Sequence, residues 1–284
     1  MKTFATAPRA EARLSRPCAL CGGRRFEALW DCGGFGFVRC ISCGLIQQNP
    51  QPLPEAVLAR YDAAYRDYEI ERQFDYAALE GKTLEDLGIE DLEADLKRRS
   101  ASRPRVVDAG CATGALLDRL RSRGWDCCGV EPCTEAAAYG RAHFGLDIRP
   151  LTLEKASLPA GSFDLVHASQ LIEHLNEPGL FLDEARRILA PGGSLILATP
   201  NADGFQAHHF GAAWRSAIND HLYLFSLNTL KALLRAHGFE PLRWITWGGW
   251  AAGQRPRFLK KPLDWAAKRY GQGDVMAILA VPRT

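Results

Sequence analysis

The fold is decided by one stretch of the chain, Val106-Val107-Asp108-Ala109-Gly110-Cys111-Ala112-Thr113-Gly114. An apolar run that ends in an acid and continues into small residues is typical of a buried strand that turns into a helix. Small residues let the backbone approach a ligand closely, and the first turn of a helix carries N–H groups without intrahelical partners. We therefore expect a strand over 105–109, a helix over 115–123 and a ligand site at the turn between them.

Strand-like and helix-like segments alternate along the chain after this turn. Apolar runs predict strands over 105–109, 125–130, 163–169, 194–199, 239–247 and 275–281. Helical patterns with stop signals predict helices over 115–123, 134–144, 178–189 and 226–237. Alternation at this spacing indicates parallel βαβ units with right-handed crossovers.

A second acid, Glu131, ends the next strand, where a carboxylate can accept hydrogen bonds from both hydroxyls of a ribose. A dinucleotide site requires the pattern G-x-G-x-x-G/A, but Ala112 replaces its second glycine and Asp108 would repel a pyrophosphate. The two acids suit S-adenosylmethionine, which has a positive amino group and no phosphate. A sheet whose turns merely need glycine would explain Gly110 and Gly114, but not the two acids.

At these residues the chain resembles the class I, Rossmann-like S-adenosylmethionine-dependent methyltransferases. Four further stretches carry the resemblance, in the family's order. They are Ser157-Leu158-Pro159-Ala160-Gly161-Ser162-Phe163-Asp164, Leu171-Ile172-Glu173-His174-Leu175, Leu189-Ala190-Pro191-Gly192-Gly193 and Ala198-Thr199-Pro200-Asn201. The resemblance covers about residues 105–240. It implies a doubly wound α/β fold with a mostly parallel, Rossmann-like sheet of seven strands whose last hairpin is antiparallel.

The resemblance also implies which residues bind the cofactor. The turn after Asp108 would line the methionine and the ribose, and Glu131 would hold the ribose hydroxyls. Other positions would lie beside the adenine or face the methionine end. The full set is Asp108, Gly110, Ala112 (often glycine in the family), Gly114, Glu131, Pro132, Leu153, Glu154 and Gln170, together with Tyr61 and Tyr65.

Two C-x-x-C pairs stand near the N-terminus, Cys18 with Cys21 and Cys40 with Cys43. Pairs of this kind are typical of a zinc site, and four thiolates close a tetrahedron without an open position for chemistry. We therefore expect a structural zinc ion in a small zinc-ribbon-like module. Redox-active or metal-free thiols are the alternative.

Composition shifts divide the chain into an N-terminal zinc-binding module over 1–50, a helical connector or lid over 51–104, and a methyltransferase domain over 105–284. The module and connector resemble a methyltransferase subgroup involved in surface-polysaccharide or secondary-metabolite tailoring. In that resemblance Tyr61 and Tyr65 close over the cofactor. The alternative is that both simply pack one helix face.

Two histidines are candidates for the general base that a hydroxyl or amine acceptor needs. His174 follows the strand over 163–169, and His221 follows Asp220 in a stretch that often borders the substrate site in the family. A neighbouring acid can hold an imidazole in one tautomer. For each histidine the alternative role is to order a loop by hydrogen bonding to the backbone.

Composition limits the partners and the location. The chain has 284 residues and a formal net charge of +2, so a global basic field for nucleic acid is absent. No apolar run reaches the roughly 20 residues of a membrane-spanning helix, and no secretory signal is recognised, so we expect a cytoplasmic protein. The basic and aromatic segment over 255–269 is interpreted as a packed helix or as a peripheral membrane contact.

The sequence thus predicts an enzyme that methylates a small-molecule acceptor such as a sugar, a polysaccharide precursor or a secondary metabolite. One alternative is a ribosomal-type RNA methyltransferase that grips RNA with the zinc module. Another is a cofactor-binding scaffold without turnover. Neither the acceptor, the methylated atom nor the oligomeric state follows from the sequence.

Overall fold

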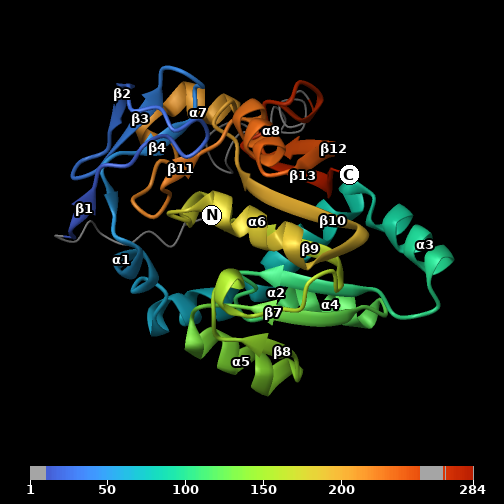
Figure 1. Cartoon of the computed structure of the whole chain (residues 1–284). Coiled ribbons are helices and arrows are strands. Elements are labelled where there is room, and N and C mark those ends of the chain that lie inside the picture. The colour runs from blue at the N-terminus through green and yellow to red at the C-terminus, as the bar shows by residue number, and fades with distance from the viewer. Residues whose placement is uncertain (1–10, 250–264, 266, 284) are drawn as a thin grey trace.

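The computed structural model describes residues 11–249, 265 and 267–283, and a seven-stranded sheet forms its centre (Figure 1). The strands are β6 (Arg105–Ala109), β7 (Asp126–Val130), β8 (Asp147–Arg149), β9 (Phe163–Ser169), β10 (Leu189–Pro200), β12 (Phe239–Trp247) and β13 (Val275–Pro282). They lie in the order β12-β13-β10-β9-β6-β7-β8. Only β13 runs against its neighbours in this sheet, β10 and β12. The predicted mostly parallel sheet with an antiparallel last hairpin is confirmed.

Two details of the sheet differ from the predicted segments. No strand was predicted over β8, whose three residues are too few to show a period and include one buried side chain, Ile148. The turn Pro191-Gly192-Gly193 was expected to separate a helix from a strand, but β10 already starts at Leu189. Its pairing with β9 shifts register between Leu189 and Ser194, so the turn forms an irregularity within one strand.

Helices cover both faces of the sheet (Figure 1). One core contains side chains of α2 (Ala63–Leu87), α3 (Ile89–Arg99), α4 (Ala115–Ser122) and α5 (Thr134–Phe144). The other contains side chains of α6 (Pro178–Ile188) and α8 (Leu227–Ala236). Leu165 of β9 belongs to the first core and Val166 to the second, as expected for alternating side chains in a strand buried on both faces.

The N-terminal module consists of short strands. They are β1 (Arg13–Leu14), β2 (Phe26–Asp31), β3 (Gly36–Cys40), β4 (Ile46–Gln48) and β5 (Gln51–Pro52). β1 pairs with β5, and the other three form a sheet with β11 (Tyr223–Leu224), which comes from a distant part of the chain. Cys18 and Leu45 share a hydrophobic core with Tyr223. The module is therefore built into the larger domain through β11.

Three helices occupy the segment expected to be a helical connector: α1 (Pro54–Leu58), α2 and α3. The Asp62 carboxylate accepts the N–H groups of Ala64 and Tyr65 and so starts α2. Gly88 ends it with a φ of 88°, in the left-handed region that favours glycine.

Short helical turns complete the fold: α7 (Phe205–Phe210) and the 3₁₀ turns η1 (Leu153–Lys155), η2 (Ile172–His174) and η3 (Gly211–Ala213). Among the helices in the described part of the chain, none is both long and apolar enough to cross a membrane. The segment over 255–269, proposed for a peripheral membrane contact, lies outside the described residues except at 265 and 267–269.

Candidate functional site

A cavity of about 730 Å³ opens at the carboxyl ends of β6, β7 and β9, beneath α2. Ligands of α/β sheets bind at such strand ends, and the volume lies within the range of small-molecule sites. The predicted cofactor residues that line it are Asp108, Gly110, Ala112, Glu131, Pro132, Leu153, Glu154, Gln170, Tyr61 and Tyr65. His174 and His221 line it as well.

The turn after β6 supports the cavity through left-handed backbone conformations. Gly110 has a φ of 71° and Ala112 a φ of 48°, which is costly for a residue with a β-carbon. Gly114, which was also expected to line the cofactor, is not among the residues that line the cavity. It caps α4, and a β-carbon there would lie 2.8 Å from the side chains of Leu146 and Ile148. Gly114 therefore allows the helix to approach the sheet closely.

Glu131 holds the turn and faces the cavity. Its carboxylate accepts the N–H groups of Ala112 at 3.0 Å and Cys133 at 2.8 Å, one on each oxygen. An ionised carboxylate accepts about four hydrogen bonds, so two acceptor positions remain for a ligand. Burial raises the pKa of Glu131 to about 7 against the effect of these two bonds, and nearby Asp108 adds to the rise.

Asp108 lies in a buried polar cluster that the sequence did not reveal. Its Oδ1 is 2.7 Å from Nδ1 of His167. Burial opposes the charged ring, but the carboxylates of Asp108 and Glu80 leave the pKa of His167 raised. Glu80 comes from α2, so the cluster connects that helix to the end of β6.

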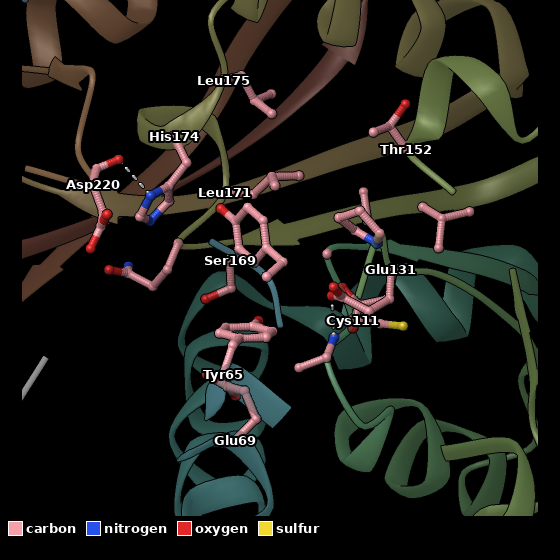
Figure 2. Close-up of a pocket in the computed structure, with 18 of the residues that line it drawn as sticks. Tyr65, Glu69, Cys111, Glu131, Thr152, Ser169, Leu171, His174, Leu175 and Asp220 are labelled. Atoms are coloured by element: carbon pink, nitrogen blue, oxygen red, sulfur yellow. Dashed lines mark hydrogen bonds between the residues drawn. The ribbon is translucent and has the colours of Figure 1, made fainter. Parts of the chain in front are cut away.

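Helix α2 forms the wall opposite the strand ends. Figure 2 shows Tyr65 and Glu69 rising from this helix towards the cavity, between Glu131 on one side and His174 on the other. The rings of Tyr61 and Tyr65 meet edge to face at 5.1 Å. Burial raises the pKa of Glu69 to about 8, with Glu131 as the next cause.

Sequence analysis did not predict most of the α2 residues that line the cavity. The further α2 residues at the cavity are Tyr68, Glu69, Gln73, Tyr76, Ala77, Leu79, Glu80 and Thr83. Tyr65, Glu69, Gln73, Tyr76 and Glu80 recur at helical spacing, and such a stripe of polar and aromatic residues on one helix face was the signal available.

The two candidate histidines lie together at the other end of the cavity, with ring centroids 4.7 Å apart. Nδ1 of His174 is 2.9 Å from the carbonyl oxygen of Asp220, as the dashed line in Figure 2 marks. Nδ1 of His221 is 2.8 Å from the carbonyl oxygen of Ser216. Burial lowers the pKa of His174 and lowers that of His221 further, so the neutral rings are favoured. Each histidine therefore both orders a loop and faces the cavity.

The four cysteines of the N-terminal module converge. Sγ of Cys18 lies 3.4 Å from Sγ of Cys43, and Sγ of Cys21 lies 3.5 Å from Sγ of Cys40. All four sulfurs fall within 4.8 Å of one another. Tetrahedral zinc with bonds of about 2.3 Å places its sulfurs about 3.8 Å apart, so the thiols could hold this ion with small adjustments.

Comparison with known proteins agrees with the fold. The pattern of a family described as a methyltransferase domain matches residues 65–243, which include most of α2, both acids and both histidines. The chain belongs to this methyltransferase family. The match begins after the four-cysteine module, which lies outside the matched residues.

Relatives of this methyltransferase include enzymes named ubiquinone biosynthesis O-methyltransferase. The Caulobacter sp. (strain K31) protein is 38% identical over 103 residues, which are 34% of this chain and 41% of that protein. The Pseudomonas aeruginosa (strain UCBPP-PA14) protein is 28% identical over 51% of this chain and 63% of its own length. The chain thus spans less than two thirds of the length of the curated relatives it matches.

Solved structures share the fold of this methyltransferase. A methyltransferase from Haloferax volcanii, in complex with the Trm112 methyltransferase activator, has a TM-score of 0.52 and 19% identity over 74% of this chain and 97% of that one. A SAM-dependent methyltransferase from Thermotoga maritima has a TM-score of 0.51 and 22% identity over 75% of this chain and 98% of that one.

Proposed function

We propose that the chain transfers a methyl group from S-adenosylmethionine to a small-molecule acceptor such as a sugar, a polysaccharide precursor or a secondary metabolite. The observation that carries this proposal is one cavity with two strand-end acids at one side and two neutral histidines at the other. The acids suit a cationic amino-acid nucleoside, and the histidines suit an acceptor that loses a proton.

The residues present fit the cofactor. Glu131 has two acceptor positions left for ribose hydroxyls after its two backbone bonds. Asp108 offers negative charge for an ammonium group, and its bond to His167 fixes the orientation of the carboxylate. Bound S-adenosylmethionine supplies an activated methyl group, so the protein mainly positions the acceptor and excludes water.

The chain's own residues account for these two tasks. The aromatic face of α2 covers the cavity at Tyr65 and limits the access of water. His174 and His221 each donate Nδ1–H to a backbone carbonyl, which leaves Nε2 without its proton. A neutral Nε2 can accept the proton of a hydroxyl or an amine.

A small acceptor is favoured over RNA by two observations. The relatives carry the name of an O-methyltransferase of ubiquinone biosynthesis, which is a small-molecule pathway. The net charge of +2 supplies no general attraction for a polyanion. Salt-dependent retention on RNA would support the alternative.

We further propose that Cys18, Cys21, Cys40 and Cys43 bind a structural zinc ion. The closed set of four thiols leaves no position for substrate. The ion would stabilise a module whose sheet is completed by β11, close to His221.

The proposal is tested by calorimetry with the demethylated cofactor, S-adenosylhomocysteine, and by turnover of methyl-labelled cofactor with a panel of sugars and phenolic metabolites. We expect binding by the native protein and clear loss in the Asp108→Asn variant. Asp118→Asn, a half-exposed acid of α4 that pairs with Arg121, serves as the matched control. A native protein that does not bind S-adenosylhomocysteine would refute the proposal, and binding without turnover of any acceptor would favour the scaffold alternative.

A further inference from the structure

A second group of metal-ligating side chains lies apart from the cysteines, at the histidine end of the cavity. One ligand atom each from Glu173, His174 and His221 falls within 4.8 Å of the other two. Glu173 and His174 are neighbours in η2, and His221 precedes β11. The N–H of Leu222 donates to the carbonyl oxygen of Glu173 at 2.7 Å, so the backbone itself holds the two segments together.

Both imidazoles are oriented as metal ligands usually are. The Nδ1 atoms of His174 and His221 lie 2.9 Å and 2.8 Å from the backbone carbonyl oxygens of Asp220 and Ser216. A carbonyl oxygen only accepts, so Nδ1 carries the proton in each ring and Nε2 keeps its lone pair. Metal-binding histidines commonly donate their second nitrogen to a backbone carbonyl in this way.

Glu173 supplies an independent observation. Its side chain is fully buried, and its Oε2 accepts the Thr199 hydroxyl at 2.9 Å. Its Oε1 is also buried and has no hydrogen-bond partner among the described residues. A buried acceptor without a partner is costly, and in native proteins it commonly indicates an ion or water at that place.

From these contacts we propose that Glu173, His174 and His221 bind one divalent transition-metal cation. Two imidazole lone pairs and a carboxylate oxygen are three acceptors, and a cation is the ligand class that satisfies three acceptors together. Two histidines and one carboxylate leave coordination positions open on metals such as Zn²⁺, Fe²⁺ or Mn²⁺. Both histidines line the cavity and Glu173 is buried behind it, so the ion would lie at the wall of the cavity.

The site gives the proposed acceptor a chemical definition. A cation at this end of the cavity would bind an oxygen of the acceptor, which favours a hydroxyl or a vicinal diol over an amine. An Nε2 atom that binds the cation cannot also accept a proton, so in the metal-bound state the cation, and not a histidine, would make the hydroxyl acidic, and its proton would pass to water. This step rests on the proposed function, but occupation of the site by a metal does not, so binding and turnover can be tested separately.

The test is a titration with Mn²⁺, followed by electron paramagnetic resonance, on the full chain with its cysteine module loaded with zinc. Mn²⁺ prefers oxygen ligands such as the Glu173 carboxylate, whereas thiolates select softer ions, so the module does not compete for the probe. We expect one Mn²⁺ per chain. His174→Asn and His221→Asn each keep a side-chain N–H donor for the backbone carbonyl while removing Nε2. His208→Ala, at an exposed position of α7, is the matched control.

Each asparagine variant should weaken Mn²⁺ binding by more than the roughly 10–100-fold that follows loss of a residue which merely orients a ligand. Glu173→Gln should do the same while keeping the bond from Thr199. Native affinity in variants with an unchanged unfolding transition would overturn the site, as would a native protein that binds no Mn²⁺. Calorimetry with S-adenosylhomocysteine on the same samples separates failure of the metal site from failure of the proposed function.

Discussion

Replacing Glu131 by glutamine tests the central electrostatic argument. The carboxylate accepts two backbone N–H groups, from Ala112 and Cys133, and keeps two acceptor positions for the ribose. Each carboxylate oxygen accepts one backbone N–H and has one position for the ribose. In Glu131→Gln an amide nitrogen replaces one of these oxygens, and it cannot accept a hydrogen bond from the backbone N–H or from the ribose hydroxyl. The substitution therefore affects both the turn and the ligand.

The size of the effect follows from these bonds. Loss of one hydrogen bond to the ribose, and of the negative charge that strengthens the other, weakens cofactor binding by about 1.5–3 kcal/mol, or roughly 10- to 100-fold. One buried N–H left without an acceptor lowers the free energy of unfolding by about 1–3 kcal/mol.

Calorimetry with S-adenosylhomocysteine measures the first quantity, and urea unfolding without ligand measures the second. Glu135→Gln, an exposed acid in the first turn of α5, is the control and should leave both unchanged within about 0.5 kcal/mol. If Glu131→Gln binds S-adenosylhomocysteine within twofold of the native protein, the assignment of this carboxylate to the ribose is wrong.

Three more perturbations test other parts of the structure. Because burial raises the pKa of Glu131 to about 7 and the ribose needs the ionised form, affinity for S-adenosylhomocysteine should fall below about pH 7 and level off above it. An affinity that calorimetry finds constant between about pH 5.5 and pH 8 would contradict this prediction. In Glu131→Gln the affinity should no longer depend on pH over this range. Removing zinc with a chelator should impair turnover more than it impairs S-adenosylhomocysteine binding. The reason is that the module supports the loop before β11, which carries His221, and not the strand ends that would bind the cofactor. Equal losses in both assays would contradict this prediction. Gln48→Leu should lower the free energy of unfolding by about 1–3 kcal/mol in urea, because the buried carbonyl of His221 would lose its donor while that of Asn219 would keep only Arg60. The Gln48 amide donates to the carbonyls of Asn219 at 2.8 Å and His221 at 2.7 Å, and an unchanged unfolding midpoint would show that these bonds contribute little.

The strand-end acids were predictable because their positions are set locally. A βα unit puts the last residue of the strand beside the first turn of the helix, so Asp108 and Glu131 reach the same edge of a parallel sheet wherever the unit occurs. The cysteine pairs were predictable for a similar reason, since each C-x-x-C forms its own turn. The structure placed these residues as expected, but it showed that Gly114 serves helix packing and does not line the cavity.

The wall formed by α2 was only partly predictable. The spacing of Tyr65, Glu69 and Gln73 indicates one face of a helix, but amphipathic spacing alone does not say what that face meets. Packing of α2 against α4 and α5 turns this polar face towards the cavity. The pairing of Asp108 with His167 also depends on the register between β6 and β9, which places these residues opposite each other.

By itself, the sequence determined the Rossmann-like order of strands and helices, the acids at the strand ends and the two cysteine pairs, because each is a short-range pattern. Only the tertiary structure decided which distant segments meet. It placed β11 in the sheet of the module and Glu173, His174 and His221 within reach of one ion. Such contacts depend on how long loops cross the ends of the sheet, and neighbouring residues in the chain do not encode that path.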